Sequence, residues 1–125
     1  MKIVIETIPH KDQRYPTVGD WFFNEKGDLT IQVPDLGDWK QEALVAIHEL
    51  VEVVLCKSQG VTQEQVDEFD LKFESSRPEN DLSEPGDATE APYKVQHCFA
   101  TGVERLLAAE LGVDWHQYEQ HLQEL

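Results

Sequence analysis

Three ionisable residues interrupt the most apolar stretch of the chain, which runs from Ala43 to Cys56. They are His48, Glu49 and Glu52. If this stretch is a helix, His48 and Glu52 are one turn apart on the same face, whereas Glu49 projects roughly 100° around the axis from them. An imidazole beside a carboxylate suits a divalent metal ion, and a neighbouring carboxylate can accept a proton from water at such a site. The pattern therefore predicts a metal-binding helix with Glu49 as the candidate catalytic base.

A second pair of polar residues has the spacing of one helix face later in the chain. His97 and Glu104 are separated by about two helical turns, so both are expected on one side of a helix. Polar groups in an apolar helix such as 43–56 cost several kcal/mol unless they are paired, open to a cleft or metal-bound. We therefore expect His48, Glu52 and His97 to bind one divalent ion, and Glu104 is the reserve ligand. Zinc is the expected metal, although other divalent ions suit the same atoms.

The same residues also have an ordinary structural explanation. A histidine and a glutamate four residues apart on a helix can form a hydrogen-bonded pair worth about a few tenths of a kcal/mol. Glu104, which precedes Arg105 in the chain, can belong to a surface ion pair. On this interpretation the polar residues are structural and bind no metal.

The segment His48-Glu49-Leu50-Val51-Glu52 resembles the His-Glu-x-x-His helix motif of the zincin metallopeptidases. Here Glu52 stands where that motif has its second histidine. The resemblance implies a reduced zincin-like core, a zinc ion and a peptidase-like hydrolase. His97 would complete a set of two histidines and one carboxylate from a later helix.

The elements around this helix predict an α+β fold. Residues 2–8 alternate in the manner of a strand and stop at Pro9. Residues 21–33 have the pattern of a β-hairpin around the turn Asn24-Glu25-Lys26-Gly27-Asp28. Together they predict a small N-terminal antiparallel β-sheet.

About four helices are predicted after the sheet, and the first, from about Trp39 to Ser58, carries the candidate ligands. The expected boundaries are capping and stop residues: Asp38 and Gly60 for the first helix, Thr62 for the second, Pro92 and Gly112 for the third, and Asp114 for the last.

Negative charge is concentrated in one part of the chain. The 125 residues include 25 acids and 10 bases, a formal net charge of -15. Ten of the acids and only two of the bases lie between Glu64 and Glu90. The centre of this stretch is rich in proline, serine and acids, which predicts a mobile acidic loop at about 75–91 within a single domain of residues 1–125. Such a loop is a solvated linker, a lid over the site or a docking segment for a basic partner.

Composition limits the partners and the compartment. A strongly negative chain repels a phosphate backbone, so direct nucleic-acid binding is not expected. No stretch reaches the roughly 18 apolar residues of a membrane span, and residues 1–6 lack a signal-peptide pattern. We therefore expect a cytoplasmic protein that contacts no membrane, and the partner left open is a protein or peptide. Cys56 and Cys98 are expected as free thiols in buried helices.

Two other functions stay open. Glu49-x-x-Glu52 and Glu64-x-x-Asp67 resemble the two acidic motifs with which all-α nucleoside triphosphate pyrophosphohydrolases bind magnesium, although acids also favour the first turn of a helix without a metal. The other is not enzymatic: a small acidic domain can be a binding protein or a mimic of nucleic acid that presents carboxylates to a basic partner.

The chain as a whole resembles small acidic proteins encoded by bacteriophages and prophages. The resemblance rests on Ile5-Glu6-Thr7-Ile8-Pro9-His10, on the His48 motif, and on Glu84-Pro85-Gly86-Asp87 with Ala91-Pro92-Tyr93. It implies a bacterial cytoplasmic setting and a phage gene, and it brings no activity with it.

Overall fold

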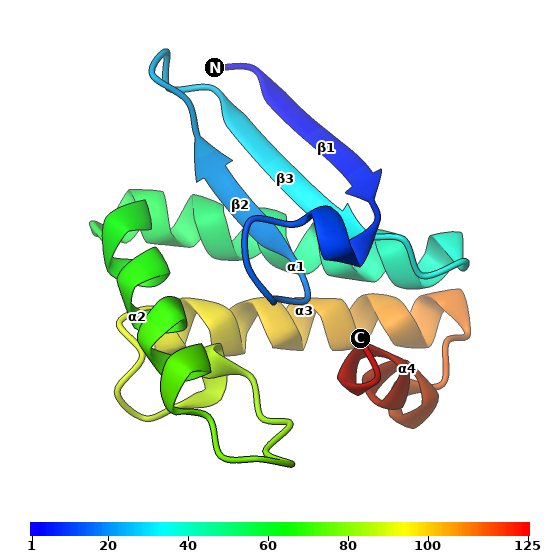
Figure 1. The fold of residues 1–125 in the computed structure, drawn as a ribbon. Helices are drawn as coiled ribbons and strands as arrows, with labels where there is room; N and C mark the ends of the chain where they lie inside the picture. The colour runs from blue at the N-terminus through cyan, green and yellow to red at the C-terminus, as the bar shows by residue number, and fades with distance from the viewer.

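A three-stranded sheet followed by four α-helices forms the protein in the computed structural model, which describes residues 1–125 (Figure 1). The strands are β1 (Ile3–Ile8), β2 (Asp20–Phe23) and β3 (Leu29–Pro34). The α-helices are α1 (Trp39–Gln59), α2 (Gln63–Ser76), α3 (Lys94–Leu111) and α4 (Trp115–Gln123), and the short 3-10 helices are η1 (His10–Asp12) and η2 (Pro85–Asp87). The predicted α+β class is confirmed.

The sheet has β3 at its centre, in the order β1-β3-β2. Strands β2 and β3 form the expected antiparallel hairpin. β1 runs parallel to β3, with Ile3 opposite Leu29 and Ile8 opposite Pro34, so the prediction of a wholly antiparallel sheet is wrong for this strand. A parallel neighbour needs a long crossover connection, and residues 9–28 provide it. Alternation within β1 carries no information about the direction of its partner.

The helix ends lie close to the predicted capping residues. The Asp38 side chain accepts hydrogen bonds from two backbone N–H groups at the start of α1, and Gly60 ends that helix with a φ of 78°. Thr62 forms a complete capping box with Gln65 at the start of α2. α3 begins at Lys94 rather than at Pro92, because a turn between the Ala91 carbonyl and the Lys94 N–H, 3.1 Å apart, precedes the helix.

Helix α1 lies at the centre of the packing, in contact with β3 and with α3 (Figure 1). Leu29, Ile31 and Val33 of β3 are buried against it, together with Leu44 and Val53 of α1 itself. Helix α1 also packs along α3, so polar residues on these two helices can come together inside the molecule.

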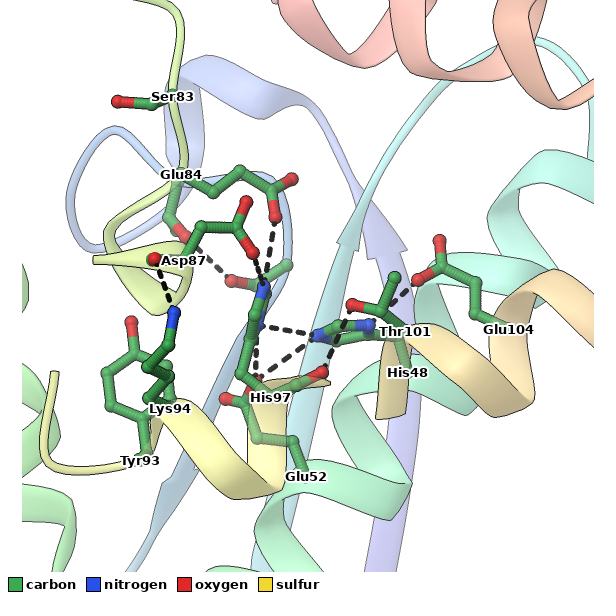
Figure 2. Close-up of polar contacts among 12 residues, drawn as sticks. His48, Glu52, Ser83, Glu84, Asp87, Tyr93, Lys94, His97, Thr101 and Glu104 are labelled. Carbon is green, nitrogen blue, oxygen red and sulfur yellow. Dashed lines mark hydrogen bonds and ion pairs between the residues drawn. The ribbon is translucent and has the colours of Figure 1, made fainter. Parts of the chain in front are cut away.

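The acidic segment between α2 and α3 folds back onto both helices at η2. The Arg77 guanidinium donates hydrogen bonds to the carbonyl oxygens of Asp81, at 2.6 Å, and of Ser83, at 2.7 Å. These bonds turn the chain so that Glu84 and Asp87 approach α3 (Figure 2). The segment expected as a loop at about 75–91 therefore contributes directly to the region around His97.

Both cysteines are free thiols. Cys56 is buried as expected, but Cys98 is exposed on α3, so the prediction of a second buried thiol is wrong. None of the helices combines the length and the apolar character that crossing a bilayer requires.

Candidate metal centre

The structure brings His48 and Glu52 of α1 together with His97 of α3 (Figure 2). His48 Nε2 lies 3.2 Å from Glu52 Oε2 and 3.1 Å from His97 Nδ1. The third side of this triangle, from His97 Nδ1 to Glu52 Oε2, is also 3.1 Å. The three side chains retain only 8%, 5% and 5% of their exposure for His48, Glu52 and His97. Three potential metal ligands thus meet at one buried point.

The outer nitrogen of His48 faces a carboxylate. His48 Nδ1 lies 2.8 Å from Glu104 Oε1, and the Tyr118 hydroxyl donates a 2.5 Å hydrogen bond to the other oxygen of Glu104. A carboxylate held in this way accepts the Nδ1 proton of a neutral imidazole. The lone pair of His48 Nε2 then points into the triangle.

The outer nitrogen of His97 also faces carboxylates. His97 Nε2 lies 3.1 Å from Asp87 Oδ1 and 3.3 Å from Glu84 Oε2 (Figure 2). Donation of the Nε2 proton to these oxygens leaves the lone pair on Nδ1, which belongs to the triangle. In the neutral tautomers that place both imidazole protons on these outer nitrogens, three lone-pair atoms converge. Histidine ligands of metal ions commonly donate their other nitrogen to a carboxylate in this manner.

The size of the triangle fits one small divalent ion. In a tetrahedral zinc site with bonds of about 2.0–2.1 Å, neighbouring ligand atoms are about 3.3 Å apart. The three observed separations of 3.1–3.2 Å are close to that value. The Trp21 indole N–H donates a 3.1 Å hydrogen bond to Glu52 Oε1, which leaves Oε2 for the triangle. These residues can hold a metal ion.

Protons compete with a metal ion for the same atoms. Burial opposes the charged form of His97, but hydrogen bonds with Glu52 and Glu84 outweigh it and raise the pKa of the imidazole to about 10. For His48, burial is likewise outweighed by hydrogen bonds with Glu104 and Glu52, and the pKa is raised well above its ordinary value. Burial acts against ionisation of Glu52, yet hydrogen bonds from both histidines lower the pKa of its carboxyl to about 2.

Glu49 lies beside the triangle and lines the adjoining pocket. Its side chain is 7% exposed, and no group of the chain donates a hydrogen bond to its carboxyl. Burial and the neighbouring charge of Glu52 raise the pKa of Glu49 well above its ordinary value. Gly19 packs so closely that a Cβ atom there would overlap the Glu49 carboxylate. Glu49 is therefore held at the site with its carboxyl free to exchange a proton with a ligand.

Glu104, the predicted reserve ligand, occupies a different place. It bonds to the outer nitrogen of His48 and to Tyr118, and it is not one of the three converging atoms. Its contact with Nδ1 of His48 makes it an orienting group for that imidazole. As predicted, His97 and Glu104 both turn from α3 toward His48. They contact different nitrogens of its ring: His97 lies at Nε2 and Glu104 at Nδ1.

Sequence reasoning missed the groups that orient the ligands. Trp21 and Tyr118 have the character of ordinary core aromatics, and nothing in their spacing relates them to α1. The acids of Glu84-Pro85-Gly86-Asp87 flank a turn-forming pair, a signal that could have placed both carboxylates on one side of a tight turn. Gly86 allows the turn to approach His97 closely, because an added Cβ would lie 2.5 Å from the imidazole.

A pocket of about 320 Å³ opens onto the triangle and Glu49. Residues 15–21, the segment 81–86, and Leu122 and Leu125 near the C-terminal end form its walls. A ligand in this pocket could reach both the metal-binding atoms and Glu49.

The acidic pair of the second helix lies apart from this site. Glu64 is exposed at the start of α2, and Asp67 accepts hydrogen bonds from Arg14 at 3.1 and 3.2 Å. Neither residue lines the pocket that contains Glu49 and Glu52. The two acidic motifs therefore do not form one magnesium-binding group.

Comparison of the chain with protein-family models, with curated proteins and with solved structures finds no match. The interpretation of the site rests on its own geometry.

Proposed function

We propose that this protein binds one zinc ion through His48, Glu52 and His97 and uses it to hydrolyse an amide bond, with Glu49 as the general base. The observation that carries the proposal is the convergence of His48 Nε2, His97 Nδ1 and Glu52 Oε2 at 3.1–3.2 Å from one another, with a carboxylate at the outer nitrogen of each imidazole. The outer carboxylates can each accept the proton of a neutral imidazole, which leaves both inner nitrogens able to bind a cation at the centre.

The donor set supports zinc over magnesium or calcium. Two imidazole nitrogens and one carboxylate oxygen are ordinary zinc ligands. Magnesium and calcium prefer sites made only of oxygen. A zinc ion held by three protein ligands keeps a position for water and makes that water more acidic.

The chain's own residues supply the rest of the proposed chemistry. Glu49 is the base that accepts a proton, because its carboxyl lies at the site without a donor of its own and its raised pKa strengthens its hold on a proton. Glu104 and Asp87 keep the two imidazoles in the tautomers that binding requires. The resemblance of the α1 motif to the zincin helix supports an amide as the bond that is cleaved.

Metal content measured by mass spectrometry on tag-free protein tests the proposal. Samples are offered zinc, manganese or magnesium and then dialysed. We expect about one equivalent of zinc in the wild type, its loss in His48→Ala and His97→Ala, and its retention in His116→Ala, a matched change at an exposed histidine of α4. Circular dichroism checks that each variant is folded. A wild type without metal under every condition would make the polar cluster structural.

A further inference from the structure

The pocket beside the triangle has a strongly negative lining. Eight of its lining residues are aspartate or glutamate, whereas one is arginine and three are histidine. One divalent ion compensates only part of this charge. An anionic ligand such as a phosphate ester would be repelled, and a cationic ligand would be attracted.

The single arginine of the pocket is already paired with groups of the chain through all three of its nitrogens. Arg77 forms a two-bonded pair with Glu74, at 3.3 and 2.7 Å. Its remaining nitrogen donates to the carbonyl oxygens of Asp81 and Ser83. Arg77 therefore shapes the wall of the pocket instead of offering a positive charge to a ligand.

Two buried carboxyl groups in the lining have no cationic partner. Glu49 receives no hydrogen bond from the chain although it is more than nine-tenths buried. Asp70, which is 5% exposed, accepts hydrogen bonds only from the neutral hydroxyls of Tyr15, at 3.0 Å, and Tyr93, at 2.5 Å. Burial raises the pKa of Asp70 to about 6 against these hydrogen bonds, so Asp70 is ionised above neutral pH. Glu84 adds a half-exposed carboxylate whose cationic contact is His97 alone.

Apolar side chains stand beside these acids. Val18, Leu82 and Leu122 line the same pocket. A lysine or arginine side chain combines an apolar stem with a charged end, so it can contact the apolar wall and a carboxylate at once. A bare metal complex would leave the apolar wall without a partner.

We propose that the substrate is a peptide with a basic side chain, lysine or arginine, which enters this pocket and pairs with its uncompensated carboxylates. The inference rests on the proposed function, since it names the substrate class of the same site. Glu84 and Asp70, which both line the pocket, are the residues that select the positive charge.

Binding of three matched peptides to the zinc-loaded protein tests this inference. Each is an alanine pentapeptide with acetylated and amidated ends, and the central residue is lysine, glutamine or glutamate. Isothermal titration at low salt should show the lysine peptide bound about tenfold more tightly than the glutamine peptide, as one charge contact in a partly buried site produces, with the glutamate peptide weakest. The preference should shrink as salt is added.

Glu84→Gln and Asp70→Asn should each reduce the preference for lysine, whereas Glu110→Gln, the same loss of charge on an exposed part of α3, should not. Equal binding of the three peptides, no detectable binding of any, or a preference for glutamate would overturn the inference. Zinc content measured on the same samples separates the two proposals. A lysine preference in a protein that holds no zinc supports the cationic pocket and contradicts the metal centre; zinc without a lysine preference does the reverse.

Discussion

At the scale of single residues, each imidazole of the triangle has a carboxylate at its outer nitrogen. Glu104 accepts from the outer nitrogen of His48 and is itself fixed by Tyr118. Loss of its charge lowers the basicity of His48 and loosens its orientation. We expect Glu104→Gln to weaken zinc binding by about 10- to 100-fold.

Competition with a chelating dye measures this loss, and Glu110→Gln on the exposed side of α3 is the control. An unchanged zinc affinity in Glu104→Gln would show that the orientation of His48 does not depend on this carboxylate.

Substitution of Glu49 tests the proposed base separately from metal binding. Glu49→Gln keeps the size of the side chain and its packing against Gly19 but removes the base. The variant should bind zinc like the wild type and should lose about 10²- to 10⁴-fold in the rate of peptide hydrolysis. Cleavage of the lysine pentapeptide, followed by mass spectrometry, measures the rate. Full activity in Glu49→Gln would assign the base to another group.

Proton competition at the histidines gives the site a pH dependence. The pKa of His97 is raised to about 10, so below that pH zinc must displace a proton to bind. Apparent zinc affinity should therefore rise as pH increases toward that value and fall as pH decreases. Titrations in two buffers with different enthalpies of protonation should reveal proton release at neutral pH. Binding without proton release would indicate that His97 is already neutral.

At the scale of elements, the approach of η2 to α3 completes the surroundings of His97. Gly86→Ala would place a Cβ 2.5 Å from the imidazole, so η2 or the ring must move and the contacts with Asp87 and Glu84 are disturbed. We expect weaker zinc binding with the fold retained. Gly102→Ala is the matched control, because a Cβ at this exposed position of α3 meets no atom within 4 Å.

The control variant, Gly102→Ala, should itself change the stability of the protein. Replacing a helical glycine by alanine stabilises a helix by about 0.5–1 kcal/mol, so Gly102→Ala should raise the free energy of unfolding by about that amount and leave zinc binding unchanged. Urea unfolding and the dye competition measure the two effects. Equal loss of zinc in both variants would mean that α3 itself, rather than η2, controls the ligand.

At the scale of the whole molecule, a metal ion held by His48, Glu52 and His97 would link the central helices α1 and α3. An ion that binds only the folded chain stabilises it by about 2.7 kcal/mol at a free concentration one hundred times Kd. We expect zinc to raise the midpoint of urea unfolding and a chelator to reverse the shift. His48→Ala should abolish the response. The same response in wild type and His48→Ala would place any zinc on other acids of this highly charged chain.

Much of the secondary structure was predictable because its determinants are local. Asp38, Gly60, Thr62 and Gly112 mark helix ends through bonds and backbone angles that involve their immediate neighbours. The nearly continuous apolar stretch from Ala43 to Cys56 likewise predicts α1 as a core helix. The direction of β1 was not predictable, because the partner of a strand is chosen by the path of the connection and not by the strand's own alternation.

By itself the sequence determined that His48 and Glu52 share one face of α1, because a helix places residues four apart in contact wherever it forms. Only the tertiary structure decided which groups complete the site. His97 meets His48 across 49 positions of sequence through the packing of α3 on α1. The same packing turns Glu104 to the outer nitrogen of His48, and the fold of the acidic segment carries Asp87 to the outer nitrogen of His97. Those contacts depend on how the helices pack and on the path of the acidic segment. Neither can be deduced from the spacing of residues along the chain.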